Sequence, residues 1–157
     1  MKAILIALAG LATFAAGSAS ADESVINKAG MTGPEVVALL QAEGYRAALS
    51  RDKQGDPMIK SATGGANFTV YFYDCEKDRC RALQFSSGFD LKDGLTLARI
   101  NEWNKGNRYL KAYLDDENDP YVEYDVNVDA GRTFSGLKDD LAIWNTMVGR
   151  FTTFIDW

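Results

Sequence analysis

The 157-residue chain carries a net charge of −5 and contains no histidine. The lack of histidine excludes Ser-His-Asp and Cys-His catalysis, His-based metal sites and the usual near-neutral pH switch. An acidic chain without a basic run also matches the phosphate backbone poorly, so no nucleic-acid partner is expected.

The first 21 residues have the pattern of a cleaved signal peptide. Lys2 supplies a positive start, residues 4–16 are apolar, and Ala19-Ser20-Ala21 has the small residues that signal peptidase reads. We expect cleavage between Ala21 and Asp22, and export to the periplasm. The apolar run is short for a bilayer, so no stable membrane insertion is expected after cleavage, although an uncleaved anchor is the alternative.

The remaining chain is long enough for a single domain with a hydrophobic core. We expect a flexible leader over residues 22–31 and one domain over residues 32–157. Cys75 and Cys80 are predicted to form a disulfide, because paired cysteines usually bridge in an oxidising compartment. Their C-x4-C spacing is not the redox C-x-x-C, and two thiolates alone do not make a structural zinc site.

The domain is predicted to begin with a helix from Gly33 to Glu43. Thr32 is a suitable N-cap, and Glu35 stands three residues later as in a capping box. Alternating apolar residues then predict a strand over Tyr45–Ser50, followed by a turn and a partner strand over Met58–Ala62.

The clearest hairpin joins residues 67–75 to residues 80–87. Placing Cys75 opposite Cys80 gives one apolar face, made of Phe68, Val70, Phe72, Leu83 and Phe85. The disulfide and the hydrophobic pattern therefore require the same register. Tyr71 and Tyr73 lie on the second face. Either another helix or a partner must cover an aromatic face, so both are candidate partner contacts.

The second half is predicted as helix, hairpin and helix. The first helix spans Leu91–Asn104 with Gly106 as its stop, and the strands span residues 108–114 and 121–128. The last helix is capped by Ser135 and has a stripe formed by Leu137, Leu141, Trp144, Val148, Phe151 and Ile155. This order predicts an α+β fold, in which three helices pack on a mainly antiparallel sheet with a four-strand run and a C-terminal hairpin.

Two acidic segments were weighed as sites. Asp115 to Asp119 resembles the start of a calcium loop, but Pro120 stands where glycine is needed, so a solvated turn is expected. Glu123 and Asp125 share a strand face and form a candidate carboxylate pair, for which cross-strand partners such as Lys111 are the simpler explanation. We predict no catalytic residue, metal or cofactor.

The corner after the second predicted helix is read as structural. Trp103 stands near Asn101 and Asn104, whose amides can bond to backbone groups that a helix end leaves unpaired. Trp144 lies on the apolar stripe and is expected in the core.

With these residues named, the chain resembles the YbjN family of bacterial sensory transduction regulators over about Gly33 to Trp157. The resemblance rests on the Glu43-Gly44-Tyr45 piece, the Phe68-to-Phe85 hairpin, Asn101, Trp103, Asn104, Arg108, Ala112-Tyr113-Leu114, Tyr121, Glu123, Asp125, Trp144 and Phe151. It implies a fold similar to type III secretion chaperones and no known catalytic residue.

Three functions follow as hypotheses. The first is a non-enzymatic periplasmic binding or regulatory module that acts through an unidentified protein partner, with a homodimer as one form. The second is a small-molecule sensor or enzyme that uses the face of Glu123 and Asp125. The third is a structural envelope protein.

Overall fold

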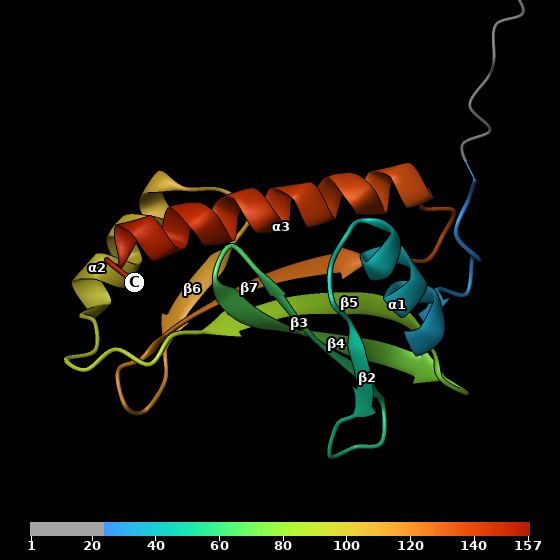
Figure 1. Ribbon diagram of the computed structural model, residues 1–157, viewed down its shortest axis with the longest axis horizontal. Coiled ribbons are helices and arrows are strands. Elements are labelled where there is room, and N and C mark those ends of the chain that lie inside the picture. Colours follow the sequence, from blue (N-terminus) through green and yellow to red (C-terminus); the bar gives the residue numbers. More distant parts are fainter. Residues whose placement is uncertain (1–23) are drawn as a thin grey trace, which may run out of the picture.

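The computed structural model describes residues 24–157 and shows the predicted α+β fold, with three helices on a seven-stranded antiparallel sheet (Figure 1). The predicted signal peptide and its cleavage point between Ala21 and Asp22 lie outside the described residues.

The sheet contains both of the predicted strand groups. Its order is β2-β3-β4-β5-β7-β6, and β1 pairs with β5 outside this path. The four-strand run is β2 to β5, and the hairpin of β6 and β7 joins it because β7 pairs with β5. The bounds are Met31–Thr32 for β1, Ala48–Arg51 for β2, Pro57–Thr63 for β3, Ala66–Glu76 for β4, Arg79–Gly88 for β5, Lys111–Leu114 for β6 and Pro120–Asn127 for β7.

The helices gather on one side of the sheet. Figure 1 shows α3 (Phe134–Phe154) lying along this side, with α1 (Gly33–Ala42) and α2 (Leu97–Gly106) towards its two ends. Trp144 of α3 packs on Phe68 and Phe85, with ring centroids 5.7 Å apart in each pair. The core therefore lies between the helices and one face of the sheet, and the opposite face carries no helix of the described chain.

The long helix α3 has the predicted apolar stripe. All six residues of that stripe are buried, and Trp144 is 0% exposed. The cap is Thr133 rather than Ser135, because the Thr133 hydroxyl accepts a hydrogen bond from the Gly136 amide at 3.1 Å. Inside the first turns, buried Asp140 accepts hydrogen bonds from the Tyr124 hydroxyl and from Arg132, which ties α3 to β7.

The register of the β4–β5 hairpin matches the prediction. Cys75 lies opposite Cys80, Phe72 opposite Leu83 and Val70 opposite Phe85. The two cysteines form a disulfide. The five residues predicted for the apolar face, from Phe68 to Phe85, are all buried.

Three predicted boundaries were wrong. Helix α2 begins at Leu97, not Leu91, because Gly94 has a φ of +59° and Thr96 caps the helix. Leu97, the first residue of this helix, is 77% exposed. Strand β2 begins at Ala48 instead of Tyr45 and is exposed along its length. Strand β6 begins at Lys111 instead of Arg108, because Tyr109 has a φ of +75° that interrupts the extended backbone.

Residues 24–31 differ from the loose leader expected for this segment. Ile26 is 2% exposed, and its amide donates to the Arg132 carbonyl at 2.8 Å. Val25 forms a β-bridge with Thr133, and buried Met31 in β1 pairs with Cys80. Within residues 24–157, no helix is both long enough and apolar enough to cross a membrane.

Candidate functional site

The face of the sheet opposite the helices carries tyrosines around a polar centre. Side chains alternate along a strand, so residues next to buried Val70, Phe72 and Val122 project to this side. We call this surface the open face. It consists of Met58, Tyr71, Tyr73, Gln84, Lys111, Tyr113, Tyr121, Glu123 and Asp125, which come from β3, β4, β5, β6 and β7.

Glu123 lies at the centre of the open face. Its carboxylate accepts hydrogen bonds from the Tyr113 hydroxyl at 2.9 Å and from Gln84 Nε2 at 3.3 Å, and its Oε2 is 2.6 Å from Lys111 Nζ. The Glu123 side chain is only 13% exposed. Side chains of the neighbouring strands therefore contact both oxygens of this carboxylate.

Gln84 extends the network across the sheet. Its Nε2 also donates to Asp125 Oδ1 at 2.8 Å, and its Oε1 accepts from the Tyr73 hydroxyl at 3.2 Å. Hydrogen bonds thus connect β4 to β6 through β5 and β7, and fix the directions of Tyr73 and Tyr113.

Two proton-carrying groups of the network, Tyr113 and Lys111, have raised pKa values. Burial raises the pKa of Tyr113 well above the usual phenol range, and the hydrogen bond and charge of Glu123 raise it further. The hydrogen bond to Glu123 also raises the pKa of Lys111. General acid–base catalysis uses groups whose pKa values lie near neutrality, whereas both of these pKa values are moved away from it.

Tyr121 continues the aromatic surface over β5. Its ring stacks on Tyr113, with centroids 5.5 Å apart and planes at 17°. It also covers Gly88, where an added Cβ would lie 2.5 Å from the Tyr121 ring. The Tyr121 ring can therefore occupy this position only because Gly88 has no side chain.

Two hollows lie on either side of Tyr71. The larger, of about 700 Å³, is formed by the β2–β3 turn together with Met58, Tyr71 and Tyr73. The smaller, of about 540 Å³, extends from Tyr71 to Tyr121. Tyr71 contributes to the wall of both.

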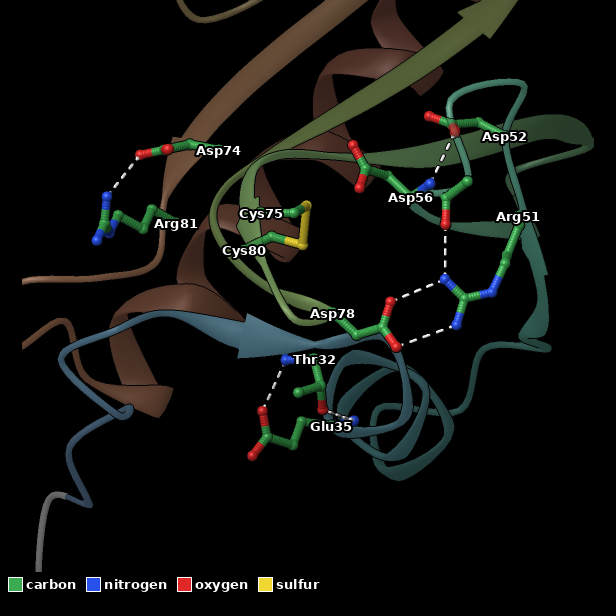
Figure 2. Close-up of a disulfide and its surroundings, with 11 residues drawn as sticks. Thr32, Glu35, Arg51, Asp52, Asp56, Asp74, Cys75, Asp78, Cys80 and Arg81 are labelled. Carbon is green, nitrogen blue, oxygen red and sulfur yellow. Dashed lines mark hydrogen bonds and ion pairs between the residues drawn. A yellow bond between two sulfur atoms is a disulfide. The ribbon is translucent and has the colours of Figure 1, made fainter.

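The tip of the β4–β5 hairpin holds the turn that borders the larger hollow. Figure 2 shows Asp78, inside the disulfide-closed loop, forming a double hydrogen bond with Arg51 at 2.8 and 3.0 Å. Arg51 also donates to the Gly55 carbonyl at 2.6 Å. The disulfide, Asp78 and Arg51 therefore connect the hairpin tip to the β2–β3 turn.

The same tip also binds the start of α1. Arg79 donates to both carboxylate oxygens of Glu35, at 2.9 and 3.0 Å, and to the Gly30 carbonyl at 2.7 Å. Glu35 in turn accepts from the Thr32 amide at 2.7 Å, which completes the predicted capping box.

The corner after α2 is structural, but its asparagines differ in role. Asn107, rather than Asn101 or Gly106, closes the helix by donating to the Trp103 carbonyl. Asn104 bonds to both backbone groups of Ala112 at 3.0 Å, so it holds β6 as a neighbouring strand would. Asn101 is exposed.

The two tryptophans of the family pattern are placed in the core. Trp103 is buried and packs on Phe151 and Phe154, at centroid distances of 4.9 and 5.4 Å. Trp144 fills the centre of the core, whereas Arg108 is exposed and lies over the Tyr109 ring.

The acidic turn after β6 is held by its own backbone. Asp115 Oδ1 accepts from the amides of Glu117 and Asp119, and Asp119 accepts from the Leu91 amide, each at 2.9 Å. Within residues 24–157, no group of three or more metal-ligating side chains is found.

The structure therefore places the residues of two separate hypotheses from the sequence on one surface. Tyr71 and Tyr73 were candidates for partner contact, and Glu123 and Asp125 were a candidate carboxylate pair. Register places Gln84 opposite both Tyr71 and Asp125. Gln84 and Tyr113 were not among the candidate site residues of the sequence. Alternation in β6, where Ala112 is buried and its neighbours are exposed, is the signal that could have identified Tyr113.

Comparison with known proteins identifies the family. A family model described as "YbjN: Putative bacterial sensory transduction regulator" matches residues 34–157, which include all three helices except the first residue of α1. Neither the curated proteins nor the solved structures contain a match to the chain. The match covers most of the sequence and nearly all of the described fold, and the chain therefore belongs to the YbjN family.

Proposed function

We propose that this protein is a non-enzymatic regulatory module that binds a protein partner through the open face. The observation that carries the proposal is an aromatic sheet face that no helix of residues 24–157 covers, on which Tyr73 is 47% and Tyr113 is 37% exposed. Tyrosine is enriched in protein interfaces, because its ring supplies contact area and its hydroxyl a hydrogen bond. Membership of the YbjN family supports the regulatory role.

The proposed location is the periplasm. The N-terminal pattern of a positive start, an apolar run and a small-residue cleavage site supports export. The Cys75–Cys80 disulfide supports an oxidising compartment. Cell fractionation with mass spectrometry of the mature N-terminus tests this location, and a chain that starts at Met1 in the cytoplasm would contradict it.

The binding role is tested by co-purification from the periplasm after cross-linking in cells. We compare the wild type, Tyr71→Ala/Tyr73→Ala and the control Tyr109→Ala. Tyr109 is 49% exposed but packs on Tyr124, whose hydroxyl bonds to α3, so it lies outside the open face. The same partner should be recovered with the wild type and the control, and at least about tenfold less with the double variant.

Recovery that is equal for all three folded proteins would show that the open face is not the binding surface. Light scattering of the purified wild type distinguishes a second copy of the chain from a different partner. A homodimer lost only in the double variant would place the self-contact on this face.

A small-molecule sensor is the second candidate, because a hollow of about 700 Å³ falls within the size range of ligand pockets. A ligand and activity screen should compare the wild type with Glu123→Gln/Asp125→Asn. A small-molecule response that disappears in this variant would favour the sensor or enzyme over the binding module. No partner and no ligand would favour the structural envelope role.

A further inference from the structure

The charged side chains around the larger hollow are unequally paired. Arg51 is neutralised by its double hydrogen bond to Asp78. Within the part of the chain that the structure describes, Asp52, Asp56 and Lys53 at the same hollow form no ion pair. Two carboxylates therefore face the hollow against one ammonium group.

The neighbouring open face adds to the negative charge. Lys111 pairs with Glu123 and also interacts through its charge with Asp125, but within residues 24–157 the exposed Asp125 accepts a hydrogen bond only from Gln84. The pKa of Tyr73 is raised by burial and by the negative charges of Glu123, Asp125 and Asp52. The hydroxyl end of Tyr73 therefore lies in a negative electrostatic potential, between the β2–β3 turn and β7.

Aromatic rings line the same hollow. Tyr71 and Tyr73 project from neighbouring positions on one face of β4 and form its wall with Met58. The face of a tyrosine ring attracts cations, and the attraction is strengthened when carboxylates stand nearby. Among protein side chains, the planar guanidinium of arginine both stacks on such rings and bonds to carboxylates.

We propose that the larger hollow receives an arginine side chain of the partner protein, stacked against Tyr71 and Tyr73 beside Asp52, with the negative charge of Asp125 on the adjoining open face. This inference rests on the proposed function and states the chemistry of the partner segment that the open face recognises. Asp52 lines the hollow from the β2–β3 turn, whereas Asp125 stands on β7, which β5 separates from β4, and belongs to the adjoining open face. The uncharged ring of Tyr121 continues the surface for the rest of the segment.

The test uses a blocked peptide, acetyl-Gly-Gly-Arg-Gly-Gly-amide, titrated into the mature protein and followed by NMR. The matched probe contains citrulline, which keeps the shape of arginine and removes its charge. The arginine peptide should shift the signals of Tyr71, Tyr73 and Asp125 but not those of Tyr109. The citrulline peptide should bind at least about tenfold more weakly.

The protein variants separate charge from folding. Asp52→Asn and Asp125→Asn keep the oxygens that accept hydrogen bonds from the Gln54 and Asp56 amides and from Gln84, so both should remain folded. Each should weaken binding of the arginine peptide about threefold to tenfold. The control Asp116→Asn makes the same charge change at the exposed β6–β7 turn and should leave binding unchanged.

Equal binding of the two peptides would overturn the arginine proposal, as would unchanged binding in the folded Asp52→Asn/Asp125→Asn variant. The proposed function has a separate outcome. If partner recovery depends on Tyr71 and Tyr73 but survives the double asparagine change, the binding face stands and the arginine site is wrong. If the peptide binds but the tyrosine changes leave partner recovery intact, the hollow binds arginine but not that of the partner, and the proposed function is wrong.

Discussion

Gly30 shows how much a single residue can decide in this fold. Its φ is +98°, a conformation that residues with a side chain rarely adopt. An added Cβ would lie 2.0 Å from the Cys80 carbonyl oxygen, which is backbone and cannot rotate away. Only glycine therefore allows the segment before α1 to approach β5 and place Met31 opposite Cys80.

We predict that Gly30→Ala destabilises the protein by about 3 kcal/mol, because backbone strain and a backbone clash add together. Gly55→Ala is the matched control. Gly55 has a similar φ of +94°, but an added Cβ meets nothing within 4 Å. It should cost only about 1 kcal/mol. Urea unfolding measures both, and equal losses would show that the contact with Cys80 is not a separate constraint.

At the scale of elements, the β4–β5 hairpin combines local and distant constraints. Its disulfide closes a short loop in which Lys77 and Asp78 have positive φ, as does Asp74 just before the loop. From this tip, Asp78 reaches the β2–β3 turn through Arg51, and Arg79 reaches α1 through Glu35. The loop therefore connects three parts of the fold besides fixing its own register.

We predict that Cys75→Ser/Cys80→Ser lowers the free energy of unfolding by about 2 kcal/mol, the chain-entropy value for a short loop. Dithiothreitol should destabilise the wild type by a similar amount and leave the double variant unchanged. The variant therefore controls for effects of dithiothreitol other than reduction of the disulfide. Mass spectrometry must find no free thiol in wild-type protein recovered from the periplasm. Free thiols there would contradict the disulfide in the cell.

The N-terminus of α1 gives the fold a component of acid sensitivity. Burial pushes the pKa of Glu35 upward, but hydrogen bonds from Arg79 and Thr32 and the charge of Arg79 outweigh it, so the pKa is lowered from 4.5. A carboxyl whose pKa is lower in the folded state stabilises the fold above its unfolded pKa. This contribution is lost as the pH falls through the folded value.

We therefore predict that Glu35→Gln costs about 0.5 kcal/mol at pH 7, a small value because Glu35 is 43% exposed. The difference from the wild type should shrink as the pH falls below about 4.5. Unfolding experiments between pH 7 and pH 3 measure it. In an Arg79→Gln background the pH-dependent difference should become smaller, and an undiminished difference would assign the effect to another group.

In the molecule as a whole, the two faces of the sheet differ in how completely they are buried. The helix side is filled by aromatic contacts, among them Trp144 on Phe68 and Phe85. The open face is only partly covered, by its own tyrosines and by the network around Glu123. Burial should therefore make the helix side the main source of stability and leave the open face available for recognition.

We predict that Trp144→Ala destabilises the fold by about 3–5 kcal/mol, because a fully buried ring leaves a cavity. Tyr73→Ala, on the open face, should cost less than about 1 kcal/mol. Thermal and urea unfolding of both variants provide the comparison. A similar loss for the two would mean that the open face is part of the stability core, contrary to a surface kept for a partner.

Much of this architecture could be predicted from local patterns. The capping box at Thr32 and Glu35, the β4–β5 register and the α3 stripe depend on residues that are near each other in sequence or joined by a turn. The start of α2 was predicted wrongly because the apolar spacing of the helix continues back to Leu91. Only the structure shows that Gly94 has a φ of +59°, which a helix cannot include.

The candidate site was predictable only in pieces. Alternation placed Tyr71 with Tyr73, and Glu123 with Asp125, on one face of each strand. Alternation along each strand does not show whether the β4–β5 and β6–β7 hairpins expose these residues on the same side of one sheet. The Gln84 bridge between Tyr73 and Asp125 exists because β5 lies between β4 and β7.

Short-range spacing and hydrophobic periodicity were enough to predict the α+β class, the order of the three helices and of β2 to β7, the hairpin register and the buried stripe of α3. The pairing of β7 with β5 and the gathering of the helices on one side become visible only in the folded chain. These choices depend on which apolar surfaces bury each other best across the whole chain. They leave Tyr71, Tyr73, Glu123 and Asp125 together on the open face.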